Sequence, residues 1–198
     1  MYKKNDTYAQ KARNENYRAR SVYKLIEIDE KHKLMRNGIT ILDLGCAPGS
    51  WSQYCLNKLQ NGLVIGIDIQ DFASLSSTST KKFIFIKSDI SDDNIFSCLK
   101  NYSFDLILSD MAPNTTGNIF TDQMRSLQIC KMGYSLFPRL LKQRGNAVMK
   151  IFASEKAQQF FLDWKKDFQN AKIFRPKAVQ KSSKEMYFIG LGFHSNIV

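Results

Sequence analysis

Residues 41–51 read Ile41-Leu-Asp-Leu-Gly-Cys-Ala-Pro-Gly-Ser-Trp51, a short apolar run followed by a glycine-rich turn. The apolar residues around Asp43 predict a buried strand, Gly45 opens a tight turn, and Pro48-Gly49 lead into a helix. Glycine lets the backbone approach a ligand closely, and a helix start offers free N–H groups. A parallel strand, a turn and a helix start in this order predict a nucleotide-binding corner.

Length and composition are those of a single globular domain. With 198 residues the chain is long enough to bury a substantial core. We expect one domain over 1–198, with a basic N-terminal arm at 1–20 and a catalytic core at 21–198. No apolar run reaches transmembrane length, so no membrane partner is expected. The four cysteines form no C-x-x-C pair and only two histidines are present, so the sequence predicts no metal site.

The net charge of +11 is concentrated in two segments. Residues 1–36 carry ten Lys and Arg against five Asp and Glu, and residues 165–184 carry seven against one. In the first segment Tyr2, Tyr8 and Tyr17 are interleaved with the cations, a combination that suits stacking on unpaired bases and contact with phosphates. The two segments therefore predict an RNA partner; a basic surface without a specific partner is the alternative.

Apolar runs and helical patterns alternate along the rest of the chain. They predict strands at 63–68, 83–86, 104–108, 147–152, 172–175 and 186–193, and helices from 21 and at 50–60, 91–99, 121–144 and 154–168. Gly145 is expected to end the helix over 121–144. The alternation predicts an α/β fold with a mostly parallel sheet, in which ligands bind beyond the carboxyl ends of the strands.

Acidic residues follow three of these strands. Asp68 ends the second strand and is placed to accept both hydroxyls of a ribose. Asp89 can accept a hydrogen bond from an adenine amino group, with Ile90 packed on the ring, or it can cap the following helix. Asp110 follows the strand at 104–108. Because the G-x-x-x-G spacing lacks the third glycine of a dinucleotide fingerprint, S-adenosylmethionine suits the site better than NAD.

Five parts of the chain carry a further pattern: Arg18-Ala-Arg-Ser-Val-Tyr-Lys24-Leu, Leu42-Asp-Leu-Gly-Cys-Ala-Pro-Gly-Ser-Trp-Ser-Gln53, Ser109-Asp-Met-Ala-Pro-Asn-Thr-Thr-Gly117, Lys150, and Ser182-Ser-Lys-Glu-Met-Tyr187. In this order they resemble the FtsJ/RrmJ-like ribosomal RNA 2'-O-methyltransferases over nearly the whole chain. The resemblance implies a Rossmann-like S-adenosylmethionine-dependent methyltransferase fold, with a seven-stranded, mostly parallel sheet, helices on both faces and the last strand antiparallel.

The resemblance also implies site residues. A Lys-Asp-Lys-Glu tetrad falls on Lys24, Asp110, Lys150 and Glu185. The family's cofactor positions fall on Gly49, Trp51, Asp68, Asp89 and Asp110, to which the residue pattern of the corner adds Gly45, Pro48 and Ile90. Cys46 and Ser50 stand where the family usually has alanine and a second glycine, and both are small enough to preserve cofactor binding.

The implied tetrad suits the chemistry of a ribose hydroxyl. A 2'-hydroxyl must lose its proton as it attacks the methyl group, and Lys150 is the expected base. Burial and the nearby ammonium of Lys24 are expected to lower the pKa of Lys150. Asp110 is expected to hold Lys150 and face the sulfonium, and Glu185 to orient a lysine or the ribose. Taken singly, Lys24 also fits a solvated helix residue, Glu185 an edge charge and Asp110 a turn cap.

The form Ser109-Asp-Met-Ala-Pro-Asn114 resembles the ribosomal RNA branch of the family. The expected target is a uridine in the A-loop of large-subunit rRNA within the ribosomal particle, bound through residues 1–36 and 165–184. The alternatives are a tRNA or mRNA-cap 2'-O-methyltransferase, a catalytically silent RNA-binding assembly factor and, more distantly, a NAD-dependent oxidoreductase. We expect a monomer. The sequence leaves cytosol, nucleus and mitochondrion or another organelle open.

Overall fold

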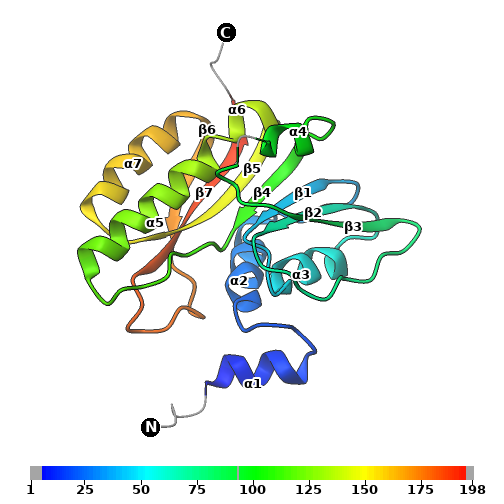
Figure 1. Ribbon diagram of the computed structural model, residues 1–198, viewed down its shortest axis with the longest axis horizontal. Coiled ribbons are helices and arrows are strands. Elements are labelled where there is room, and N and C mark those ends of the chain that lie inside the picture. Colours follow the sequence, from blue (N-terminus) through cyan, green and yellow to red (C-terminus); the bar gives the residue numbers. More distant parts are fainter. Residues whose placement is uncertain (1–5, 93, 195–198) are drawn as a thin grey trace.

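A computed structural model describes residues 6–92 and 94–194. Its centre is a seven-stranded sheet in the order β3-β2-β1-β4-β5-β7-β6 (Figure 1). The strands are β1 (Thr40–Leu44), β2 (Gly62–Asp68), β3 (Lys81–Lys87), β4 (Phe104–Ser109), β5 (Leu141–Phe152), β6 (Phe168–Phe174) and β7 (Glu185–Phe193). β1 to β5 pair in parallel, and β7 is antiparallel to both of its neighbours, β5 and β6. The expected mostly parallel sheet with an antiparallel last strand is confirmed.

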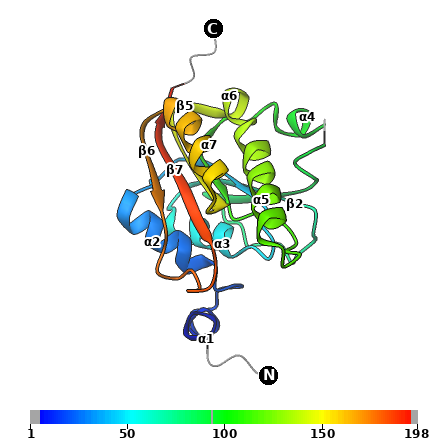
Figure 2. The ribbon, with the colours of Figure 1, turned by 90° about the vertical axis from the view of Figure 1, so that its left-hand side faces the viewer.

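Helices cover both faces of the sheet (Figure 2). The cluster of buried side chains on one face includes α4 (Ile95–Leu99), α5 (Ile119–Tyr134), α6 (Phe137–Leu140) and α7 (Glu155–Lys166), and the cluster on the other includes α2 (Val22–His32) and α3 (Ser50–Lys58). Because successive side chains of a strand point to opposite faces, Leu42 and Leu44 of β1 enter the first cluster and Ile41 enters the second. Because helices cover both faces of the sheet, β1 has apolar side chains on both of its faces.

The N-terminal segment packs on the core through a short helix, α1 (Thr7–Asn14), next to α2 (Figure 1). Ala12 is buried, and the ring of Tyr8 lies 5.4 Å from that of Tyr23. The second basic segment, residues 165–184, contacts the same part of the molecule, because the backbone N–H of Lys177 donates to Glu27 Oε2 of α2 at 2.7 Å. The parts of the two basic segments that the structure describes therefore lie side by side, while residues 1–5, Tyr2 among them, lie outside the described residues. Within the described residues, no helix is long and apolar enough to cross a membrane.

The helix predicted over 121–144 is wrong beyond Tyr134. α5 ends there, α6 forms a separate short turn, and β5 begins at Leu141, so that Gly145 lies inside a strand. Pro138 in the first turn of α6 has no N–H to donate, which prevents α5 from running on. The apolar spacing of the region fits a broken helix followed by a strand as well as it fits one long helix.

Candidate active site

Four ionisable side chains from separate elements meet at one edge of the sheet. Lys24 comes from α2, Asp110 follows β4, Lys150 lies in β5, and Glu185 begins β7. Lys150 Nζ lies 3.0 Å from Asp110 Oδ1, and Lys24 Nζ lies 3.7 Å from the same oxygen. Lys24 Nζ also donates to Glu185 Oε2 at 2.6 Å, and Lys150 Nζ donates to the backbone carbonyl of Asp110. Two ammonium groups thus share one carboxylate.

The sheet register explains how the last strand completes this cluster. Lys150 of β5 is directly opposite Tyr187 of β7, and Phe152 is opposite Glu185. The Tyr187 hydroxyl donates to Asp110 Oδ1 at 2.7 Å. Burial alone would raise the pKa of Asp110, but Lys150, Lys24 and the Tyr187 hydroxyl outweigh it and hold this pKa below its ordinary value. Asp110 is therefore ionised at neutral pH.

A cavity of about 460 Å³ opens beside Asp110 at the carboxyl ends of the parallel strands. Five of the expected cofactor residues line it: Gly45, Asp68, Asp89, Ile90 and Asp110. Asp68 also shapes its walls, because Oδ2 accepts from the N–H of Ala47 at 2.9 Å and Oδ1 from the N–H of Gln70 at 2.8 Å. Asp89 Oδ1 accepts from both the N–H and the hydroxyl of Ser91 at 2.8 Å, so it caps a local turn as well as facing the cavity.

The turn after β1 uses the N–H groups of Gly45, Cys46, Ala47 and Gly49 in bonds within the protein. The N–H groups of Gly45 and Cys46 donate to the carbonyl of Ile67 at 2.8 and 3.1 Å. The N–H of Gly49 donates to the backbone carbonyl of Cys46 at 2.6 Å. Together with the bond from Ala47 to Asp68, these contacts fix the turn against the end of β2. The turn is therefore a rigid wall of the cavity.

The other three expected cofactor residues lie outside the cavity lining. Pro48 is exposed, and Gly49 precedes α3 in a left-handed conformation with a φ of 103°. Trp51 is buried, its Nε1–H donates to the carbonyl of Ser21 at 2.9 Å, and its ring lies 5.9 Å from that of Tyr187. Trp51 therefore packs on Tyr187, whose hydroxyl donates to Asp110 of the Lys-Asp-Lys-Glu cluster. Cofactor contact by Pro48, Gly49 and Trp51 stays a prediction.

Sequence reasoning missed Met111 and Met132, which form part of the apolar lining of the cavity. Met111 packs so closely on Gly45 that a Cβ added there would lie 2.3 Å from Met111 Cγ. The signal for Met111 was its position directly after Asp110. Met132 gave none, because its spacing in α5 is that of an ordinary core residue.

A family model for FtsJ-like methyltransferases matches residues 17–193. The chain belongs to the FtsJ-like methyltransferase family. Among its relatives, Ribosomal RNA large subunit methyltransferase E of Borrelia garinii is 42% identical over 98% of this chain and 99% of its own length. The protein of the same name from Bdellovibrio bacteriovorus is 39% identical over 96% and 97%. A ribosomal RNA methyltransferase crystal structure from Plasmodium falciparum superimposes with a TM-score of 0.76 at 27% identity, covering 89% of this chain and 98% of that one.

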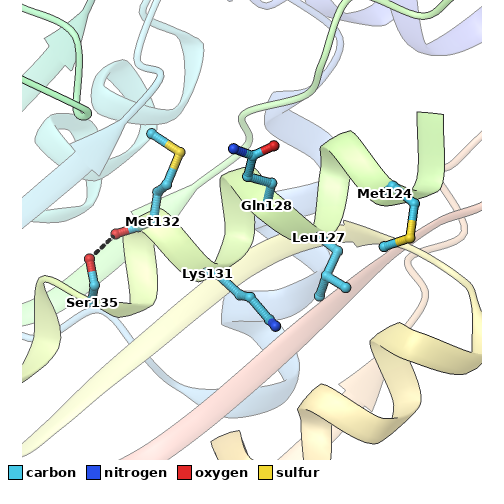
Figure 3. A pocket seen from close by; sticks show the side chains of 6 residues that line it. All are labelled: Met124, Leu127, Gln128, Lys131, Met132 and Ser135. Atoms are coloured by element: carbon cyan, nitrogen blue, oxygen red, sulfur yellow. Dashed lines mark hydrogen bonds between the residues drawn. The ribbon is translucent and has the colours of Figure 1, made fainter. Parts of the chain in front are cut away.

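This FtsJ-like methyltransferase has a second, more open hollow of about 430 Å³ along α5 (Figure 3). Its lining is Met124, Leu127, Gln128, Lys131, Met132 and Ser135. In Figure 3 the side chains of Gln128 and Met132 point to one side of the helix and that of Lys131 to the other. Because this lining has no carboxylate and none of Lys24, Asp110, Lys150 and Glu185, the cavity beside Asp110 is the candidate active site of the methyltransferase.

Proposed function

We propose that this protein transfers the methyl group of S-adenosylmethionine to a ribose 2'-hydroxyl of large-subunit ribosomal RNA. The observation that carries the proposal is the cluster of Lys24, Asp110, Lys150 and Glu185 beside the cavity. Largely buried charges are costly to keep, and a protein that only binds RNA has no need of them. The printed names of its relatives support the same substrate class.

The residues around the cavity fit S-adenosylmethionine. Asp68 suits the two ribose hydroxyls, while Asp89 and Ile90 suit the amino edge and the face of adenine. Asp110 and the backbone at Gly45 suit the charged amino-acid tail. When bound, this cofactor supplies a methyl group on a positively charged sulfur, and the Asp110 carboxylate offers the opposite charge.

Lys150 is the proposed base. Its Nζ is fixed by the Asp110 carboxylate at 3.0 Å. In its neutral form the amine accepts the 2'-proton as the hydroxyl oxygen attacks the methyl carbon and the bond from that carbon to sulfur breaks. Glu185 orients Lys24 rather than Lys150, since it binds Lys24 Nζ at 2.6 Å. Lys24 in turn shares the charge of Asp110. The reaction then depends mainly on how these residues position the ribose, and no metal is needed.

The two basic segments are the proposed RNA-binding surface. Residues 1–36 and 165–184 carry most of the excess charge and are joined by the bond from Lys177 to Glu27. Lys11, Lys31 and Lys177 line one hollow between them, together with three aromatic rings and two carboxylates: Tyr8, Tyr23, Phe174, Glu27 and Glu30. Cations beside aromatic rings suit phosphates and unpaired bases. The proposed target is a uridine of the A-loop, and the proposed active form is a monomer.

The test is methyl transfer from labelled S-adenosylmethionine to purified large subunits, free rRNA and bulk tRNA, followed by mapping of the modified nucleoside. We expect a 2'-O-methyluridine in the A-loop, and no transfer with the Lys150→Ala variant. Label in tRNA alone would overturn the substrate, while label on a base nitrogen or carbon would overturn the reaction.

A further inference from the structure

Arg18 lies between α1 and α2, in the basic N-terminal segment, but its guanidinium points at backbone carbonyls. Nη1 donates to the carbonyls of Pro48, at 3.1 Å, and of Ala73, and Nη2 donates to the carbonyl of Ser74 at 3.0 Å. The backbone N–H of Arg18 donates to Gln53 Oε1 at 3.2 Å. One residue thus joins three parts of the chain that are far apart in sequence.

The carbonyls that Arg18 holds belong to the two loops that wall the cavity. Pro48 is in the turn between β1 and α3, whose Gly45 and Ala47 line the cavity. Ala73 and Ser74 are in the loop after β2, whose Ile69 and Gln70 line it from the other side. Arg18 therefore fixes the spacing of the two loops on either side of Asp68.

Aromatic packing supports the same arrangement. The Arg18 guanidinium lies 5.4 Å from the centre of the Phe72 ring, and Phe72 packs on Phe85 of β3 at 5.0 Å between ring centroids. A Cβ added at Gly49 would lie 2.8 Å from Phe72 Cε2 and 3.1 Å from Arg18 Nη1. Gly49, Phe72 and Arg18 are in such close contact that a side chain at 49 would push the two loops apart.

We infer that Arg18 is a positioning residue for the cofactor, rather than one of the phosphate contacts of the basic segment. A guanidinium has five N–H donors in a fixed fork, and three of them are committed here to carbonyl oxygens. To bind a phosphate the group would give up bonds that hold the cavity walls. This inference rests on the proposed function, because the cavity is assigned there to S-adenosylmethionine.

The test compares Arg18→Ala and the milder Arg18→Gln with two matched controls. Arg13→Ala removes an exposed cation of α1, and Lys87→Ala removes an exposed ion pair, at 2.9 Å, to Asp71 in the same loop as Ala73. Cofactor affinity is measured by titration calorimetry with S-adenosylmethionine and S-adenosylhomocysteine. RNA affinity is measured by filter binding of rRNA at several salt concentrations. The constants kcat and KM are measured by transfer of labelled methyl groups, with both substrates varied.

For both Arg18 variants we expect Kd and KM for S-adenosylmethionine to rise about tenfold, the equivalent of one charge-assisted hydrogen bond. We expect kcat at saturating cofactor and the slope of RNA affinity against salt to stay unchanged. Lys87→Ala should leave cofactor affinity unchanged. A substitution that merely loosened the fold would lower the melting temperature and kcat without this selective rise in KM.

Two results would overturn the inference. One is an unchanged cofactor affinity in Arg18→Gln. The other is a loss of RNA affinity in which the salt slope falls by about one, as removal of a phosphate contact predicts. If Arg18→Ala does not fold, Arg18→Gln decides the question alone. A wild-type protein that binds no S-adenosylmethionine would refute the proposed function itself, which distinguishes the two failures.

Discussion

Asp43 is a buried carboxyl whose ionisation should make the stability of the protein depend on pH near neutrality. It lies in β1 with only 1% of its surface exposed, and the Ser52 hydroxyl donates to its Oδ2 at 2.6 Å. Burial first, and then the negative charges of Asp110 and Asp68, raise its pKa from 3.8 to about 7, against the opposing effect of the Ser52 bond. Asp43→Asn keeps an acceptor for Ser52 and cannot ionise.

The magnitude follows from proton linkage. A pKa that rises from 3.8 to about 7, at about 1.36 kcal/mol for each pH unit, corresponds to about 4 kcal/mol. Because the pKa of Asp43 is raised in the folded state, this contribution to stability is fully present below about pH 4. It is lost as the pH rises to about 7, since the unfolded chain releases its proton first. For a chain of this size the loss corresponds to roughly 8–16 °C in melting temperature.

The assay is thermal unfolding, followed by circular dichroism, of the wild type and Asp43→Asn at intervals between about pH 3.5 and 8, a range that spans the unfolded and folded pKa values of Asp43. The quantity measured is the difference in melting temperature between the two proteins as a function of pH. We expect the melting temperature of the variant to rise relative to that of the wild type between about pH 4 and 7, and the difference to level off above about pH 7. Asp163→Asn, which removes an exposed carboxylate paired with Lys166, controls for the loss of one charge. A difference that stays constant within about 2 °C would refute the reasoning.

Three further predictions concern the cluster and the cavity. Lys150→Ala should abolish methyl transfer and leave cofactor affinity within about threefold, measured by label transfer and calorimetry; retained turnover would exclude Lys150 as the base. Asp68→Asn should weaken cofactor binding about tenfold without changing RNA affinity, and an equal Kd would remove Asp68 from the site. Tyr187→Phe removes a donor to Asp110 and should lower the free energy of unfolding by about 1.5–3 kcal/mol, with an unchanged urea midpoint as the contrary result.

The parts of the fold that the sequence predicted are those determined by local pattern. The apolar run at β1, the positive φ of 71° at Gly45 and the acid that ends β2 each have a short-range signature. The parallel topology predicted that these residues meet, because the carboxyl ends of parallel strands lie at one edge of the sheet. Asp68, Asp89 and Asp110 accordingly line a single cavity. The tetrad positions came from resemblance to the family, since no spacing in the sequence links Lys24 to Glu185.

The features that sequence reasoning missed depend on contacts between distant residues. Leu140 and Leu141 suit a helix face and a strand equally, and only the pairing of Leu141 with Phe104 decides for the strand. Arg18 looks like any cation of a basic segment until the two loops it holds are folded beside it. The bond from Trp51 Nε1 to the carbonyl of Ser21, which anchors α3 to the N-terminal segment, likewise has no signature in the local sequence.

The position of β7 in the sheet means that two strand pairings, β5 with β7 and β6 with β7, require the last strand of the chain. It is the last strand in the chain, yet it lies between β5 and β6, and it brings Glu185 and Tyr187 to a cluster whose other members come from earlier elements. During synthesis β6 emerges before the strand it pairs with, and β5 has one flank open until β7 inserts. Until that step Lys24 lacks Glu185, the nearer of its two carboxylate partners, and β5 offers an edge for wrong pairing. Pairing of β7 therefore completes the Lys-Asp-Lys-Glu cluster and covers the open flank of β5 in the same step.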